Sequence, residues 1–238
     1  MGRMADIKYK LTSLQGKVIA IDGPAGAGKS TTAKLLAERL GFYYLDTGAM
    51  YRALTYFALK NDISPSDGEK LATAACKLHL GFDNRDGLNR ILVNGVDVST
   101  QIRTPEVTTH VSEVSAHKMV RETIVAKQRE LGKRGSIVAE GRDTTTVVFP
   151  GADVKIYLEA SIAERARRRL LDLAKMGVGT SLEEQETEIR RRDEYDSKRA
   201  HSPLTKARDA FLVDTTNLTI EQQVDHIVSL ILLAVKRS

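Results

Sequence analysis

Short apolar runs alternate with longer segments whose apolar residues recur every three or four positions. The run "KVIAIDG" at 17–23 is almost continuously apolar and ends in glycine, which is typical of a parallel strand buried on both faces. After it, apolar side chains at Ala33, Leu36 and Leu40 share one face of a helix, and Gly41 supplies its C-cap. The same analysis predicts strands at 17–23, 42–46, 136–141, 154–160 and 210–216. It predicts helices at 29–41, 48–61, 64–78, 120–135, 161–176, 181–198 and from 219 onward.

Apolar strands separated by helices favour an α/β fold with a five-stranded parallel sheet and helices on both faces. The chain shows no internal repeat and no low-complexity tract. We therefore expect residues 1–238 to form a single domain that carries insertions.

The middle of the chain has a different pattern. Ser64 followed by Pro65 predicts a helix start, with the serine as N-cap and the proline at the first helical position. Two short apolar runs are then separated by "NRDG", which is a strong signal for an antiparallel hairpin. Because a hairpin does not fit a parallel sheet, residues 62–110 are interpreted as an insertion into the core.

Composition is typical of a globular protein, with 42% hydrophobic and 28% charged residues among 238. No apolar run is long enough to cross a bilayer, and the N-terminus lacks the apolar stretch of a signal peptide. The single cysteine, Cys76, excludes an internal disulfide, and no Cys/His cluster has zinc spacing. These features predict a cytoplasmic protein that has no membrane partner.

The net charge and its distribution along the chain indicate which kinds of partner the protein can bind. The formal net charge of +5 is compatible with nucleotides, nucleic acid or an anionic membrane. From 161 to 200, however, eight Arg and two Lys alternate with nine Asp and Glu. A surface that binds a nucleic-acid backbone would not usually alternate signs so closely, so these arginines are expected to have specific partners and nucleic acid is not expected.

The most specific motif follows the first predicted strand. Gly23, four residues, then Gly28, Lys29 and Ser30 fit the phosphate-loop pattern in its strand-to-helix context. Glycines allow backbone N–H groups to converge on phosphate oxygens at a helix N-terminus, while the lysine reaches the β- and γ-phosphates and the serine hydroxyl is a Mg²⁺ ligand. The predicted donor site comprises Gly23, Pro24, Ala25, Gly26, Ala27, Gly28, Lys29, Ser30 and Thr31.

What accepts the phosphate is a separate question. The chain lacks the guanine motif of GTPases, and "FLVD" at 211–214 matches the acidic strand of ATP-driven motors only in part. A small kinase instead needs a second anion site, with arginines that offset repulsion between two phosphates. Arg142 and Asp143 follow a predicted strand at its carboxyl end, where open α/β sheets bind ligands. Further candidates are Arg52, Arg121, Arg192, Asp196 and Arg199.

Several blocks, in order, resemble the bacterial cytidylate kinase family from about residue 17 to residue 230. They are "IDGPAGAGKST", "LDTGAMYRA", "EGRDTTTVVFP", "VKIYLEAS", "ERARRR" and "RRDEYDSKRAHSPL". The resemblance implies a nucleoside-monophosphate-kinase fold of the phosphate-loop class. It also implies transfer of the γ-phosphoryl group of ATP, with Mg²⁺, to CMP or dCMP. Residues 62–110 would then be the monophosphate-binding insertion and 161–200 a helical lid.

Site roles implied by the resemblance follow matching positions. Thr47 and, more weakly, Ser112 match residues near the pyrimidine ring, which Arg121, Asp143 and Arg199 would surround. Phosphate contacts match Arg52 and Arg142, and sugar contacts match Arg192 and Asp196. Arginines of the lid helix that would approach the transferring group are Arg165, Arg168 and Arg169, which join Lys29 and Arg142 as predicted catalytic residues.

The chemistry of cytosine agrees with these roles. A carboxylate such as Asp143 accepts a hydrogen bond from the N4 amino group of cytosine and would repel the carbonyl oxygen of uracil. No general base is required, because the CMP phosphate is itself the nucleophile and alignment with charge neutralisation supplies the catalysis. One departure concerns Thr144 and Thr145, which replace the hydrophobic residue and glycine usual in the family and put the local geometry in question.

Three alternatives stay open from the sequence. A kinase of the same fold could act on UMP or another small acceptor. A nucleotide-dependent RNA-binding switch would show salt-sensitive affinity for nucleic acid. A structural protein with a vestigial phosphate loop is the third, although Lys29 and Ser30 are intact. A monomer is expected because the charged helices offer no evident apolar interface.

Overall fold

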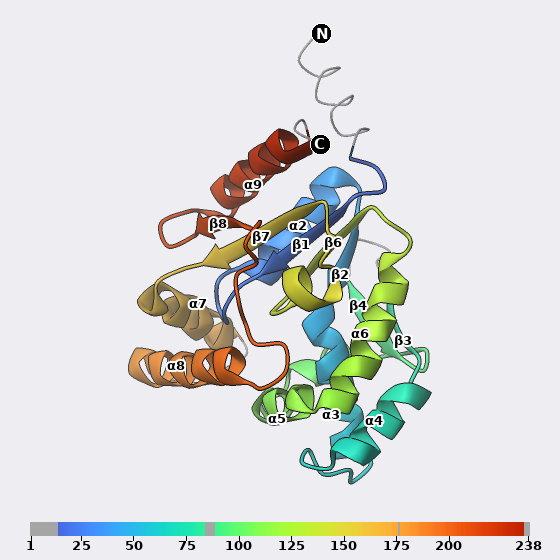
Figure 1. Cartoon of the computed structure of the whole chain (residues 1–238). Helices are drawn as coiled ribbons and strands as arrows, with labels where there is room; N and C mark the ends of the chain where they lie inside the picture. The colour runs from blue at the N-terminus through green and yellow to red at the C-terminus, as the bar shows by residue number, and fades with distance from the viewer. Residues whose placement is uncertain (1–13, 84–88, 176, 236–238) are drawn as a thin grey trace.

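A five-stranded sheet in which every neighbouring pair is parallel forms the centre of the molecule (Figure 1). The computed structural model describes residues 14–83, 89–175 and 177–235. The strand order β2-β6-β1-β7-β8 confirms the predicted α/β fold class. The strands are β1 (Val18–Asp22), β2 (Tyr43–Asp46), β6 (Ile137–Gly141), β7 (Val154–Glu159) and β8 (Phe211–Asp214).

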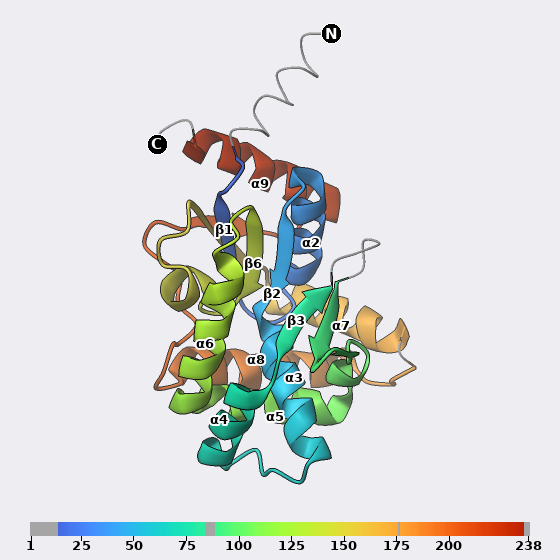
Figure 2. The ribbon, with the colours of Figure 1, turned by 90° about the vertical axis from the view of Figure 1, so that its right-hand side faces the viewer.

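Helices cover both faces of this sheet, as expected for strands with continuous apolar runs. Side chains alternate along β6, so that Val138 packs with α2, α9 and the apolar residues of β7, whereas Ile137 and Ala139 pack on the opposite face beneath Leu131 of α6. Figure 2 shows α2 and α9 together on one side of the strands. The helices are α2 (Lys29–Leu40), α3 (Thr47–Lys60), α4 (Gly68–Lys77), α5 (Pro105–Ala116), α6 (Lys118–Gly132), α7 (Ile162–Lys175), α8 (Leu182–Lys198) and α9 (Ile220–Val235).

A separate antiparallel sheet of three short strands lies in the middle of the chain. It consists of β3 (Leu80–Asp83), β4 (Arg90–Val93) and β5 (Val96–Asp97). The β3–β4 pairing confirms the predicted hairpin, while the "NRDG" turn itself and the N-terminal tail before residue 14 lie outside the described residues. The predicted insertion boundary at residue 110 falls within α5.

The predicted start of α4 is wrong by several residues. The helix begins at Gly68, and the side chain of Asp67 caps it by accepting a hydrogen bond of 3.0 Å from the backbone N–H of Lys70. Ser64 Oγ is instead hydrogen-bonded to Ser66 Oγ at 2.8 Å, which satisfies the hydroxyl in a local turn. A carboxylate cap competes well with a serine cap, because it also interacts favourably with the helix dipole.

Each strand of the parallel sheet points the same way, so their carboxyl ends meet at one edge. The phosphate loop leaves β1 there, α3 leaves β2, and the segment containing Arg142 and Asp143 leaves β6. Helices α7 and α8 lie beside each other at this same end (Figure 1). Among the described helices, none combines the length and apolarity needed to cross a membrane.

Candidate active site

Residues 23–28 form a tight glycine-rich turn between β1 and α2. Gly26 and Gly28 have φ angles of +77° and +87°, in the left-handed region that side chains other than glycine rarely adopt. A Cβ atom on Gly26 would also lie 3.0 Å from the Cβ atom of Arg165. Glycine is therefore required for both backbone conformation and close packing, and the backbone N–H groups at the start of α2 face the cavity.

Lys29 is the first residue of α2 and is buried, at 5% exposure. Its Nζ atom donates a 2.8 Å hydrogen bond to the carbonyl oxygen of Pro24, which bends the side chain back over the loop. Burial, together with the positive charges of Arg142 and Arg192, lowers the pKa of Lys29 to about 7. A buried cation in this position would be stabilised by an arriving phosphate.

Ser30 lies beside Lys29 and donates a 2.7 Å hydrogen bond from its hydroxyl to the carboxylate of Glu140 at the end of β6. Burial, and next the charge of Asp46, raise the pKa of Glu140. A hydroxyl and a carboxylate are oxygen ligands of the kind Mg²⁺ prefers, and Mg²⁺ usually takes only one or two protein ligands along with phosphate oxygens. The described residues contain no group of three His, Cys, Asp or Glu that could hold a metal alone. These residues therefore fit Mg²⁺ carried in with a nucleotide.

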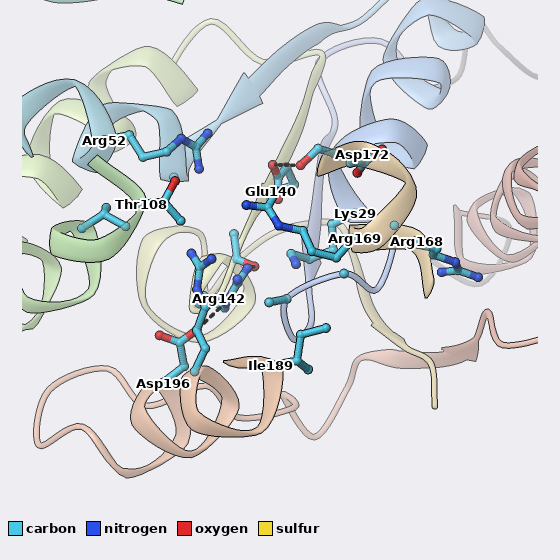
Figure 3. A pocket seen from close by; sticks show the side chains of 18 of the residues that line it. Lys29, Arg52, Thr108, Glu140, Arg142, Arg168, Arg169, Asp172, Ile189 and Asp196 are labelled. Atoms are coloured by element: carbon cyan, nitrogen blue, oxygen red, sulfur yellow. Dashed lines mark hydrogen bonds and ion pairs between the residues drawn. The ribbon is translucent and has the colours of Figure 1, made fainter. Parts of the chain in front are cut away.

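One cavity of about 880 Å³ joins the phosphate loop to the segment after β6. Figure 3 shows Arg52 and Thr108 on one wall, Lys29 and Arg169 on another, and Arg142 with Asp196 between them. Most predicted site residues line it: Ala25, Gly26, Gly28, Lys29, Ser30, Thr31, Thr47, Arg52, Ser112, Arg121, Arg142, Asp143, Arg168, Arg169, Arg192, Asp196 and Arg199. The predicted site residues that do not line the cavity are Gly23, Pro24, Ala27 and Arg165.

Carboxylates hold several of the cavity's arginines in place. Arg142 Nε donates to Asp196 Oδ2 at 2.8 Å, and Arg52 Nη2 donates to Asp46 Oδ2 at 2.8 Å. The charge of Asp196, acting against the cost of burial, contributes to raising the pKa of Arg142. These pairs fix the guanidinium groups before any ligand arrives, which reduces the entropy lost on binding.

Asp143 is the centre of a second cluster. It accepts a hydrogen bond from Arg121, and Arg199 Nη2 lies 3.8 Å from its other carboxylate oxygen. Arg121 in turn lies over the ring of Tyr51, with its Cζ atom 5.3 Å from the ring centroid. Thr47 is oriented differently, because its hydroxyl donates to the backbone carbonyl of Glu140 at 2.7 Å. The carboxylate of Asp143 is thus held rigidly at the cavity wall.

Two cavity arginines have no such compensation. The side chains of Arg169 and Arg192 make no hydrogen bond or ion pair with any residue that the structure describes. Burial, and next the charge of Arg142, lower the pKa of Arg192 to about 10. Half-buried guanidinium groups that lack a hydrogen-bond partner are costly, so this part of the cavity is suited to an anion.

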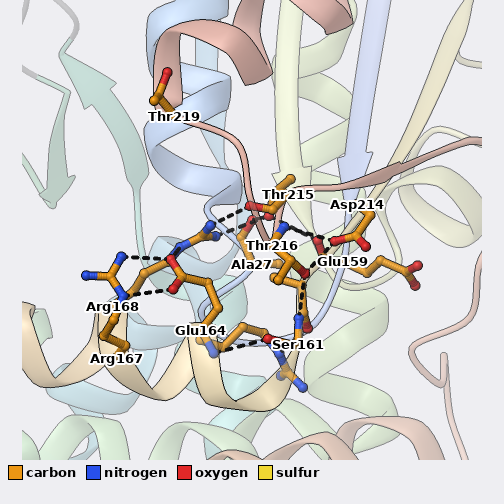
Figure 4. A network of polar contacts seen from close by, with 12 residues as sticks. Ala27, Glu159, Ser161, Glu164, Arg167, Arg168, Asp214, Thr215, Thr216 and Thr219 are labelled. Carbon is orange, nitrogen blue, oxygen red and sulfur yellow. Dashed lines mark hydrogen bonds and ion pairs between the residues drawn. The ribbon is translucent and has the colours of Figure 1, made fainter.

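The other predicted arginines of α7, Arg165 and Arg168, have protein partners. Arg165 Nη1 donates to the carbonyl oxygen of Ala25 at 3.1 Å and to Asp193 Oδ2 at 2.6 Å, which ties the phosphate loop to α8 from behind the cavity. Figure 4 shows Arg168 between Glu164 and Thr215, with bonds of 2.8 Å and 2.6 Å. Hydrogen bonds from Arg167, and next from Arg168, lower the pKa of Glu164 to about 2 despite its partial burial.

Sequence reasoning missed three buried carboxylates in this site: Asp22, Asp46 and Glu140. Each stands at or next to the last position of a parallel strand, at the carboxyl edge where ligands bind. An acidic residue closing an otherwise apolar run was the signal available to find them.

Comparisons with known proteins show which family the chain resembles. A sequence profile of the cytidylate kinase family matches residues 19–232. A protein named cytidylate kinase from Bacillus cytotoxicus is 48% identical over 213 residues, covering 90% of this chain and 95% of that protein. Another, from Geobacter sulfurreducens, is 45% identical and covers 91% and 93%. A bifunctional pantoate ligase/cytidylate kinase from Synechococcus elongatus is 50% identical, over 92% of this chain and 43% of that protein.

Proposed function

The chain belongs to the cytidylate kinase family, and on that premise we propose that it transfers the γ-phosphoryl group of ATP to CMP or dCMP, which yields ADP and CDP or dCDP. One observation carries the proposal. A phosphate loop and a second set of anchored arginines line the same cavity, with unpaired guanidinium groups between them. That layout suits two phosphates brought together against their repulsion.

The donor would occupy the phosphate loop. Backbone N–H groups of residues 25–31 and the helix dipole of α2 would bind the triphosphate, and Lys29 would exchange its bond to Pro24 for the β- and γ-phosphates. Ser30, hydrogen-bonded to Glu140, would hold Mg²⁺. The ion supplies neutralisation of charge on the phosphate oxygens.

The acceptor would bind on the opposite side. Arg142 and Arg52, each held by a carboxylate, would bind the phosphate of CMP. Asp143 would accept a hydrogen bond from the cytosine amino group, with Arg121 and Arg199 around the ring. Asp196, with Arg192, would reach the sugar, as the family resemblance implies, and Thr47 and Ser112 would lie near the base.

Catalysis in this proposal needs no proton acceptor. The acceptor phosphate attacks the γ-phosphorus directly, so the protein contributes alignment and positive charge. Arg169 would be free to approach the transferring group, because it is bound to no carboxylate among the described residues. Arg168 and Arg165 would act less directly, since both are committed to other partners.

We also propose that α7 and α8, within 161–200, act as a lid and that residues 62–110 form the monophosphate-binding insertion of one domain. Closing the lid would exclude water, which otherwise competes with CMP for the γ-phosphoryl group. Gly177, with φ of +73°, provides a turn between the two helices.

A monomeric state is part of the proposal, and a cytoplasmic location stays a prediction. Exposed large apolar side chains occur on many elements, including Leu35 on α2, Val96 on β5, Met119 on α6 and Leu212 on β8, and also on α7 and α8 at Leu171, Leu182 and Tyr195. A stable dimer would need them gathered into one patch. Sedimentation velocity at two protein concentrations should give a single species of about 26.2 kDa.

The function is tested by ADP release from ATP and Mg²⁺, with CMP, dCMP, UMP and AMP offered separately and a blank without acceptor. We expect turnover with CMP and dCMP and little with UMP or AMP. ADP released equally in the blank would contradict the proposal and favour a hydrolase or a switch.

A further inference from the structure

Asp22, the last residue of β1, is completely buried yet carries a carboxylate. Both of its oxygens are used. Oδ1 accepts a 2.8 Å hydrogen bond from the backbone N–H of Thr144, and Oδ2 accepts bonds from the backbone N–H and the hydroxyl of Thr145, at 2.7 Å and 2.6 Å. Burial nonetheless raises the pKa of Asp22, so each of these donors matters for keeping the carboxylate charged.

This contact joins the two halves of the cavity. Asp22 is followed directly by Gly23, where the phosphate loop begins, and Thr144 directly follows Asp143. Thr144 also starts a π-helical turn, η3 (Thr144–Val148), whose last two backbone N–H groups donate to the carbonyl oxygen of Asp143 at 2.8 Å and 3.1 Å. Turns of this kind are frequent at functional sites. The backbone of Asp143 is therefore fixed by a turn that is itself fastened to the end of β1.

We propose that Thr145, through the bond from its hydroxyl to Asp22, is a positioning residue that holds Asp143 and Arg142 in register with the phosphate loop. The inference rests on the proposed function, since it assigns the bond a role in placing CMP against ATP. Thr145 does not line the cavity and touches no substrate itself. The threonine that departs from the family's usual glycine is accommodated because its hydroxyl has a buried acceptor.

The neighbouring threonine provides a matched control. Thr144 is buried to the same degree as Thr145, but its hydroxyl has no hydrogen-bond partner. Thr144→Val and Thr145→Val therefore remove the same hydroxyl from adjacent buried positions, and only the second removes a bond to Asp22. Thr145→Ser keeps a hydroxyl and should restore the parent behaviour.

The experiment measures kcat and KM for CMP, UMP and ATP, with the melting temperature of each variant. A bond to a charged group that orients a site is expected to change kcat/KM for CMP by roughly ten- to hundredfold. We expect Thr145→Val to show this loss, a reduced preference for CMP over UMP, and a KM for ATP within about twofold of the parent. Thr144→Val and Thr145→Ser should match the parent in kcat/KM for CMP, in the preference for CMP over UMP and in the KM for ATP.

A purely structural role would lower the melting temperature of Thr145→Val and leave the CMP to UMP ratio unchanged, and that result would overturn the proposal. An equal loss of kcat/KM for CMP in Thr144→Val would also overturn the proposal. If Thr145→Val does not fold, Thr145→Ala removes the hydroxyl without a branched side chain and is judged by the same ratio. A parent protein without CMP turnover would overturn the proposed function, and this inference with it, whereas an active parent with an unaffected ratio in the variant overturns the inference alone.

Discussion

In the proposed function, Asp143 is the single residue that selects which base the acceptor site holds. Its carboxylate only accepts hydrogen bonds, and Arg121 and Arg199 fix it against rotation. We expect Asp143→Asn to lower the ratio of kcat/KM for CMP to that for UMP by about ten- to a hundredfold, because the amide can donate to the uracil carbonyl. Asp196→Asn is the control, since a sugar contact should weaken both substrates equally. An unchanged ratio in Asp143→Asn would exclude this role.

The lowered pKa of Lys29 predicts that the protein takes up a proton when it binds ATP. Its pKa of about 7 in the free protein leaves it mostly neutral at pH 8.5, while bound phosphates favour the charged form and raise that pKa. ATP binding at pH 8.5 should thus take up nearly one proton, and the uptake should vanish near pH 6, where Lys29 is already charged. Calorimetry in buffers of different ionisation enthalpy measures it. Lys29→Arg, which is charged throughout, should bind ATP without uptake, and equal uptake in both proteins would contradict the assignment.

At the scale of elements, the end of α2 illustrates a conformational requirement that is separate from packing. Gly41 caps the helix with φ of +67°, and a Cβ atom there would meet no atom within 4 Å. Gly41→Ala should lower the free energy of unfolding by about 1 kcal/mol, solely through the left-handed backbone. Gly151→Ala, equally unobstructed but without a positive φ, should change it by less than about 0.5 kcal/mol in the same urea titration. Equal effects would show that conformation is not the cause.

The elements best predicted from sequence were those with strong periodicity. The strands and α2 have strong apolar patterns, and glycine follows β1 and α2 and ends β6, so local signals agreed with the tertiary fold. Helix α5 was not predicted as an element, although Val107, Val111 and Val114 form its buried face at helical spacing. Its valines and threonines have weak helix propensity, and packing against α3 and α6 decides its structure.

The candidate site also contains some residues that local sequence patterns predict and others that they do not. The phosphate loop and the Arg142–Asp143 pair are local patterns, so spacing alone located them. Asp46 is only six positions from the Arg52 that it holds, but Asp196, which holds Arg142, comes from a segment 54 positions away. Such partners depend on the register of β6 between β1 and β2 and on the docking of α8, neither of which a single sequence specifies.

Across the whole molecule, two large apolar clusters form most of the described core. One packs α3, α4, α5 and α6 around the small sheet, and the other packs α2 and α9 on the parallel sheet. Burial, and next the positive charge of Arg142, lower the pKa of Arg192, so the protein without ligand carries unfavourable repulsion at this point of the site. A ligand with enough negative charge to span both subsites should relieve it.

We therefore expect adenosine and cytidine joined by five phosphates to stabilise the protein more than ATP or CMP alone. At a hundred times its dissociation constant, a ligand adds about 2.7 kcal/mol, which for a chain of this size raises the melting temperature by roughly 5 to 11 °C. The analogue with adenosine at both ends should have a smaller effect at equal concentration, because Asp143 and its arginines would meet the wrong base. Arg192→Met should reduce the shift for the mixed compound, since it removes a cation that no described carboxylate pairs. A shift no larger than that of ATP alone would mean that the two subsites are not bridged.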